Sequence, residues 1–371
     1  MIIPAARVLF DGRFRPGTVR VEAGQIREIL PEPSAPRGTL TPGLVDIHTN
    51  GGFGVDFAEA DEPLFRRVLD AMARRGTTSV QVTSVTAPIP SLLASLERCH
   101  TAQKTLAGEP VARILGAHVE GPFLAEARRG AHRADWLTDP TLDRLDPLLV
   151  HPVLTMMTLA PERDGAIEAI RRLTERGVHV SVGHTDATAD QVRAGADAGA
   201  TLVTHLFNAM RPFHHRDPGV PGAALTDPRL TLGLIGDCGH VHPIACRLAF
   251  QAAGGRIALV SDSVSLAGMP AGTTLVFGGM PATLDAQGLA RRRDGTISGA
   301  GTLLDEGVRR MIGAGLDPAV VIDAATRVPA QALGRHDVGV VAVGTEADLV
   351  LWDAAWQPLR VWVHGREVGG G

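Results

Sequence analysis

The chain has 371 residues, which corresponds to two or three ordinary domains or to one α/β barrel with an addition. A net charge of -4 and the absence of Tyr exclude a generally basic nucleic-acid binder and an aromatic platform for single strands. Three Cys cannot form a disulfide framework. A metal, if the protein binds one, would therefore be held by some of the fourteen His together with carboxylates.

No targeting or membrane-spanning segment is indicated. The first residues, MIIPAARVLFDGRF, lack the basic stretch followed by an apolar stretch that marks a secretory signal. No apolar run approaches the roughly 18–20 residues that cross a bilayer. We therefore expect a cytoplasmic protein that binds neither membranes nor nucleic acid.

Both ends of the chain consist of short β-type runs separated by Gly-containing turns. Residues 5–30 and 337–366 share this pattern, and neither segment is long enough to bury a core alone. We predict that residues 1–43 and 335–371 combine into one small β-sandwich domain, and that residues 44–334 are inserted between them.

The inserted segment alternates short apolar runs with helical patterns, several of which end in Gly. Eight runs qualify as strands, at residues 44–48, 78–85, 114–121, 153–160, 179–185, 201–208, 230–237 and 257–263. Eight strands alternating with helices indicate a parallel sheet closed as a (β/α)8 TIM barrel. Residues 209–229, rich in Pro and Gly, are expected to form a long loop without a helix, and residues 264–297 an added β-hairpin or meander.

Polar residues recur at the C-terminal ends of the predicted strands, where barrel enzymes carry their active sites. Glu120, His184 and His205 would meet at that mouth, and three N/O ligands with one open position are typical of a catalytic metal site. Taken singly, each could also be a structural residue. Asp262, at the end of the eighth strand, is either a general base or the cap of the following turn.

Several motifs occur in the order found in one enzyme family. They are PGLVDIHTNGGFGVDF, HVEGPFL, VGHTDAT, THLFNAM, RDPG and VSDS, with VEAGQIREI and GTEADLVLWD near the two ends. Over nearly its whole length the chain resembles the N-acetylglucosamine-6-phosphate deacetylases of the amidohydrolase superfamily. HVEGPF and THLFNAM are specific to that family, whereas ADLVLWD marks only the superfamily.

The resemblance implies catalytic and metal-binding roles for five matching residues. Glu120, His184 and His205 would bind one divalent metal per subunit, with zinc as the first choice and iron as the alternative. Asp262 would act as general base and then as acid, and His132 would hydrogen-bond the acetyl carbonyl oxygen.

The resemblance also implies how the sugar phosphate is bound. Asn208, the backbone of Ala209, and His240 would contact the sugar or its phosphate. Arg216 would reach the phosphate site of the partner subunit, so a homodimer is expected.

One departure concerns the end of the first strand. Two-metal members of the superfamily carry the motif HxH there, but this chain has His48, Thr49 and Asn50. Asn is a poor zinc ligand beside imidazole. We therefore predict one tightly held metal, with His48 and Asn50 behind it or forming a weak second site.

The expected reaction is hydrolysis of N-acetyl-D-glucosamine 6-phosphate to D-glucosamine 6-phosphate and acetate. The nearest alternative is a deacetylase for another sugar phosphate, such as N-acetylgalactosamine 6-phosphate, since no residue reveals which epimer is bound. A cyclic-amide hydrolase would want a carboxylated Lys at a strand end, but the one Lys, Lys104, lies in a predicted helix. A sugar-phosphate sensor without activity is the remaining alternative.

Overall fold

The computed structural model describes residues 1–35 and 38–369. Its centre is a parallel barrel in which each strand pairs with its neighbours in chain order. The ring closes where the Asp262 amide donates to the His48 carbonyl at 2.9 Å, and Thr49 bridges Ser263. The predicted TIM barrel is confirmed, and its strands are β7 (Leu44–Thr49), β10 (Thr77–Val85), β11 (Arg113–Glu120), β12 (Leu154–Leu159), β13 (His179–Val182), β14 (Leu202–Val203), β15 (Thr231–Ile235) and β16 (Ile257–Val260).

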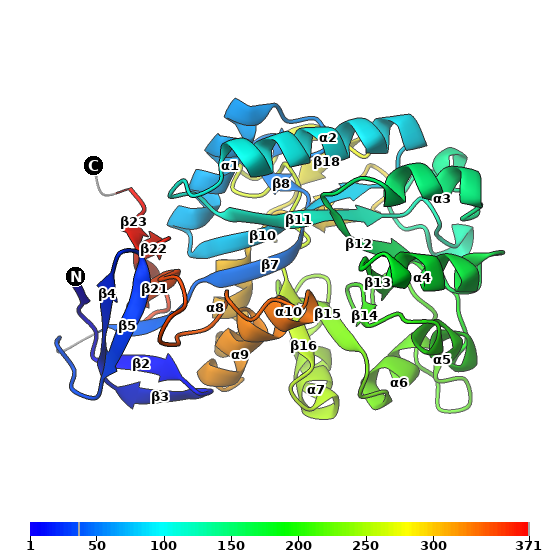
Figure 1. Cartoon of the computed structure of the whole chain (residues 1–371). Helices are drawn as coiled ribbons and strands as arrows, with labels where there is room; N and C mark the ends of the chain where they lie inside the picture. Colours follow the sequence, from blue (N-terminus) through cyan, green and yellow to red (C-terminus); the bar gives the residue numbers. More distant parts are fainter. Residues whose placement is uncertain (36–37, 370–371) are drawn as a thin grey trace.

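Helices pack around the outside of this barrel (Figure 1). In α4, Ala166, Ala169, Ile170 and Leu173 are buried, and this spacing places them on one helical face toward the strands. The helices are α1 (Glu62–Arg74), α2 (Ile89–Thr105), α3 (Leu142–Leu149), α4 (Ala166–Glu175), α5 (Ala189–Asp197), α6 (Gly219–Thr226), α7 (Pro243–Ala253), α8 (Leu304–Gly313), α9 (Pro318–Ala324) and α10 (Arg327–Ala332). None of the helices in the described ranges is both long and apolar enough to cross a membrane.

The expectation of a helix-free loop over residues 209–229 is wrong, because α6 forms inside it. The segment GVPGAALT is almost entirely small or apolar, so it shows no alternation between a polar and an apolar face. Burial of Val220, Ala223 and Ala224 stabilises it instead, and Pro221 lies in its first turn, where a missing N–H costs little. The remainder of the segment, around His214 and Arg216, is irregular as expected.

The two chain ends form a small β-sandwich beside the barrel, at the side where both termini lie (Figure 1). One sheet contains β1 (Ile2–Ile3), β4 (Thr18–Glu22) and β5 (Gln25–Leu30). The other joins both ends of the chain in the order β23 (Arg366–Glu367), β22 (Pro358–Val363), β21 (Leu349–Trp352), β6 (Thr39–Pro42), β2 (Arg7–Phe10) and β3 (Arg13–Pro16). Arg113 at the start of β11 pairs with Asp348 at 2.9 Å, which ties this unit to the barrel.

The added β-structure after the eighth strand is also confirmed. It is a four-stranded antiparallel sheet of β17 (Thr274–Phe277), β18 (Met280–Leu284), β19 (Leu289–Arg291) and β20 (Ile297–Ala300). The turn between β17 and β18 uses Gly278 and Gly279 with φ of 57° and 73°. We call this sheet the lid sheet, since its residues Phe277 and Ser298 line the cavity described below.

Close packing at the junction of β6 and β7 gives a stability prediction. A Cβ added at Gly43 would lie 2.1 Å from Oγ1 of the buried Thr78. We expect Gly43→Ala to lower the free energy of unfolding by about 1–3 kcal/mol through overpacking. Gly313→Ala, at the end of α8 where a Cβ meets nothing within 4 Å, should instead raise it by about 0.4–1 kcal/mol. Urea unfolding of both variants measures this, and equal changes would contradict the packing argument.

Candidate active site

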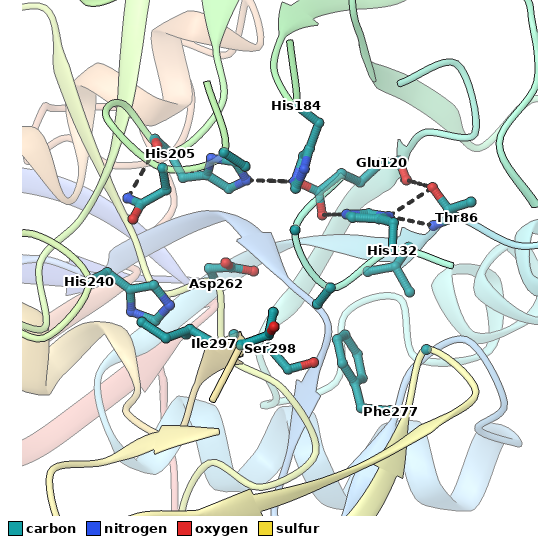
Figure 2. A pocket seen from close by; sticks show the side chains of 18 of the residues that line it. Thr86, Glu120, His132, His184, His205, His240, Asp262, Phe277, Ile297 and Ser298 are labelled. Atoms are coloured by element: carbon teal, nitrogen blue, oxygen red, sulfur yellow. Dashed lines mark hydrogen bonds and ion pairs between the residues drawn. The ribbon is translucent and has the colours of Figure 1, made fainter. Parts of the chain in front are cut away.

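Three strand ends bring Glu120, His184 and His205 together at the C-terminal mouth of the barrel (Figure 2). Glu120 is the last residue of β11, and each His follows its own strand, β13 or β14, by two residues. Glu120 Oε1 lies 3.2 Å from Nε2 of both His184 and His205, and the two Nε2 atoms are 3.0 Å apart. All three side chains are buried.

This donor set fits a divalent metal. Ligand atoms about 2.0–2.1 Å from a tetrahedral metal lie about 3.3 Å from one another, close to the separations found here. His184 Nδ1 lies 3.0 Å from the Arg128 carbonyl oxygen, to which it can donate only as the Nδ1–H tautomer. That tautomer leaves a lone pair on Nε2, facing the other two ligands. One carboxylate and two imidazoles also leave coordination positions open, as catalytic sites require.

The charge of Glu120 depends on its imidazole neighbours. Burial alone would raise the pKa of this carboxyl. His48, His184 and His205 oppose that effect, and the pKa of Glu120 is held well below its ordinary value. Glu120 is therefore an anion deep in the protein, which suits a cation ligand.

A second group lies directly behind the first and shares Glu120 with it. His48 Nε2 is 3.3 Å from Glu120 Oε2 and 3.3 Å from Asp262 Oδ1. Burial lowers the pKa of His48, but the two carboxylates outweigh burial and raise it to about 9. Asn50 uses its amide Nδ2 to donate to Asp262 Oδ1 at 3.1 Å. In this arrangement Asn50 holds a carboxylate rather than presenting an oxygen ligand.

His132 approaches the cluster from the loop after β11. Its ring packs edge-on against His184 with centroids 4.3 Å apart, and its Nε2 lies 3.9 Å from Glu120 Oε2. Burial and the neighbouring His184 lower the pKa of His132 well below its ordinary value, so the ring is neutral. The other ring nitrogen, Nδ1, lies 2.8 Å from the hydroxyl of Thr86.

These side chains face a cavity of about 270 Å³. Asp262, Asn208, Ala209 and His240 line it, whereas Arg216 lies on the exposed loop outside it, beside His215. Its remaining walls come from the ends of β10 and β15, from the loop after β11 and from the lid sheet (Figure 2).

His240 is anchored by Asp237 at the end of β15. Asp237 Oδ1 accepts from the His240 amide at 2.9 Å, and Oδ2 lies 2.7 Å from His240 Nδ1. Burial opposes the charged imidazole, but this carboxylate outweighs it and raises the pKa of His240. An imidazole whose protonated form is favoured in this way suits an anionic ligand group at the cavity wall.

The backbone is strained where the strands end. His184, His205 and Asp262 have φ of 47°, 31° and 48°, and Ala209 has 48°. A left-handed conformation costs a residue with a side chain about 1–3 kcal/mol and persists only where the surroundings enforce it. At these positions the left-handed backbone directs side chains that lie just beyond the strand ends into the mouth of the barrel.

Comparison with known proteins agrees with the site described above. A sequence profile described as "Amidohydrolase family" matches residues 39–368. The chain belongs to the amidohydrolase family. The resemblance carried by the motifs is thereby confirmed, and so is the predicted hydrolase class of enzyme.

Individual amidohydrolases match over almost the full chain. The "N-acetylgalactosamine-6-phosphate deacetylase" of Escherichia coli O157:H7 is 35% identical, with 98% of each chain covered. The "N-acetylglucosamine-6-phosphate deacetylase" of Vibrio furnissii is 35% identical over 89% of this chain and 82% of its own. A solved structure of a mutant N-acetyl-D-glucosamine-6-phosphate deacetylase from Mycobacterium smegmatis, in complex with N-acetyl-D-glucosamine-6-phosphate, matches with a TM-score of 0.92, 33% identity and 99% coverage of both chains.

Sequence reasoning missed Thr86 and the lid residues Phe277 and Ser298 as parts of the cavity wall. Thr86 directly follows β10, the same position relative to its strand that drew attention to the polar residues of other strands. A Thr beside a β-strand is so common that its type alone gave no signal.

The donor set predicts how metal content responds to mutation. We expect one divalent metal per subunit, measured by mass spectrometry on dialysed protein. Glu120→Gln should lower this to near zero, because it removes the one anionic ligand. His100→Gln, on α2 far from the mouth, should retain the metal. Two metals per subunit at full activity would contradict the single-metal prediction, and retention by Glu120→Gln would contradict the ligand assignment.

Proposed function

We propose that this amidohydrolase removes the acetyl group from N-acetyl-D-glucosamine 6-phosphate, giving D-glucosamine 6-phosphate and acetate. The observation that carries the proposal is the convergence of Glu120, His184, His205, Asp262 and His132 on one cavity, in a chain whose relatives are named as deacetylases of such sugar phosphates. We assign the reaction to a barrel unit of residues 44–334, with 1–43 and 335–371 as the small domain.

Glu120, His184 and His205 would hold one divalent metal, for which zinc is the first candidate and iron the second. When bound, such a metal supplies Lewis acidity, which makes water more acidic and a carbonyl more electrophilic. Within the chain, the lid sheet would help to exclude water, because its residues Phe277, Ile297 and Ser298 line the cavity across from Glu120 (Figure 2).

Asp262 is the group that moves the proton. Its Oδ1 is engaged by Asn50 and lies beside His48, which assigns the transfer to Oδ2. The carboxylate takes a proton from the attacking water and then returns it to the amide nitrogen as the C–N bond breaks. The left-handed backbone at Asp262 keeps the carboxylate at the cavity wall.

His132 is the donor for the acetyl carbonyl oxygen. A neutral imidazole that offers Nε2–H stabilises the negative charge that develops on this oxygen in the tetrahedral transition state. A buried donor serves here better than a solvated one, because little reorganisation is needed as the charge forms.

The sugar phosphate would lie toward Asn208, Ala209 and His240, at the cavity wall where Asp237 raises the pKa of His240 and so favours its protonated form. Arg216 would complete this site from the partner subunit of a homodimer, since it lies outside its own cavity.

The alternative substrate is N-acetylgalactosamine 6-phosphate, which the name of the Escherichia coli O157:H7 relative favours. The ratio of kcat/KM on the two sugars decides between them.

Proton transfer by Asp262 gives a test of the reaction. Asp262→Asn should keep the metal and lower kcat for acetate release by about 10²–10⁴-fold, the usual contribution of general acid–base catalysis. Asp294→Asn, on an exposed turn of the lid sheet, is the matched control and should leave kcat unchanged. Retained activity in Asp262→Asn would refute the base assignment, and a wild-type protein that releases no acetate from either sugar would refute the function.

The phosphate assignment predicts a separation of KM from kcat. Arg216→Ala should raise KM for the phosphorylated sugar about tenfold to hundredfold, the value of one charge-assisted hydrogen bond, with a much smaller change in kcat. Arg193→Ala, an exposed Arg on α5, should change neither constant. An unchanged KM in Arg216→Ala would remove this residue from the phosphate site.

A further inference from the structure

Thr86 lies at the wall of the candidate active site, beside His132 and Glu120. It is the first residue after β10, it is buried, and it lines the cavity (Figure 2). Its hydroxyl oxygen is 2.8 Å from His132 Nδ1 and 3.2 Å from the carbonyl oxygen of Glu120. Its backbone N–H points at the same His132 Nδ1, at 3.4 Å.

These contacts decide which nitrogen of His132 carries the proton. A backbone N–H can only donate, so the nitrogen that it faces must present a lone pair. Because the backbone N–H fixes Nδ1 as an acceptor, the 2.8 Å contact between Nδ1 and the hydroxyl is a hydrogen bond that the hydroxyl donates, and the contact of the hydroxyl with the Glu120 carbonyl at 3.2 Å is the longer one. Both groups of Thr86 therefore act on Nδ1 as donors, so Nδ1 carries no proton and the ring proton resides on Nε2.

The other hydrogen bonds around His132 hold the backbone of its loop and do not involve the imidazole ring. The His132 amide donates to the Arg129 carbonyl at 3.0 Å, and Arg129 Nη1 donates to the His132 carbonyl at 3.1 Å. From the lid sheet, the guanidinium of Arg292 donates to the Ala131 carbonyl. The edge-on packing against His184 restricts the plane of the ring, but it does not select a tautomer.

We propose that Thr86 is a positioning residue that holds His132 in the Nε2–H form, with that N–H directed into the cavity. The proposal rests on the proposed function, in which His132 must donate to the acetyl carbonyl oxygen. The opposite tautomer would present a lone pair to an oxygen that is gaining negative charge, which destabilises the transition state. Thr86 thus contributes to the reaction through His132 and without contact to the substrate's carbonyl.

Two variants of Thr86 separate the hydroxyl from the shape of the side chain. Thr86→Val keeps the branched shape and removes the oxygen, and we expect kcat to fall about tenfold to hundredfold with little change in KM. Thr86→Ser restores the oxygen and should recover most of that loss. Equal kcat in Thr86→Val and wild type would overturn the proposal, and so would failure of Ser to recover more kcat than Val in a metal-loaded protein.

A double-mutant cycle identifies the route of the effect. His132→Asn alone should lower kcat by about 10²–10³-fold, as loss of one oxyanion donor does. Adding Thr86→Val to His132→Asn should cost little more, because the group on which Thr86 acts has gone. Fully multiplicative losses would show that Thr86 works through the Glu120 carbonyl instead, which would overturn the route through His132.

A spectroscopic measurement tests the tautomer without reference to turnover. In metal-loaded protein with ¹⁵N-labelled His, the His132 ring, assigned by comparison with His132→Asn, should show a protonated Nε2 and an unprotonated Nδ1. Thr86→Val keeps the backbone N–H but removes the hydroxyl 2.8 Å from Nδ1, so the fraction of the other tautomer should rise. A protonated Nδ1 in the wild type would overturn the proposal. If the wild type released no acetate, the proposed function would fail while this measurement still decided the role of Thr86.

Discussion

A carboxylate buried in the mouth of the barrel is the constraint around which the site is arranged. Glu120 is about 3% exposed, and an ionised carboxyl at such a position costs several kcal/mol unless it is compensated. The compensation comes from imidazoles at the ends of three other strands, His48, His184 and His205, and a divalent metal held by this donor set would add to it. Binding chemistry and fold stability are therefore coupled at this one residue.

The barrel satisfies this constraint with residues that are far apart in the sequence. Every barrel strand except β12 supplies one or two side chains at or just beyond its C-terminal end, and closure between β7 and β16 brings Asp262 next to His48 and Asn50. The left-handed backbone at His184, His205 and Asp262 is the local cost of aiming those side chains inward. Packing of the surrounding strands and helices offsets that cost, which is why a large scaffold carries a small site.

The sequence allowed the barrel and the strand-end cluster to be predicted, because apolar runs of similar length alternated with helical patterns and most of these runs ended in a polar residue. It did not allow α6 to be predicted, since a helix made of small apolar residues lacks the periodicity by which amphipathic helices are recognised. Thr86 was missed for a different reason. Its role depends on its contacts with His132 and Glu120, which residue type and position in the sequence do not reveal. The position of Arg216 outside the cavity depends likewise on loop geometry.

The two groups that would handle the amide bond are held by separate parts of the structure. Asp262 belongs to the seam where the barrel closes, so its position follows from strand pairing. His132 belongs to a loop fixed by Thr86 from the barrel side and by Arg292 from the lid sheet. The turn at Gly279 of the lid sheet packs closely on Trp136, which belongs to the same loop as His132. A Cβ added at Gly279 would lie 2.9 Å from the Trp136 ring. The distance between the proposed base and the proposed carbonyl donor therefore depends on how the lid sheet sits on the barrel as well as on Thr86, which would make that sheet part of the catalytic geometry.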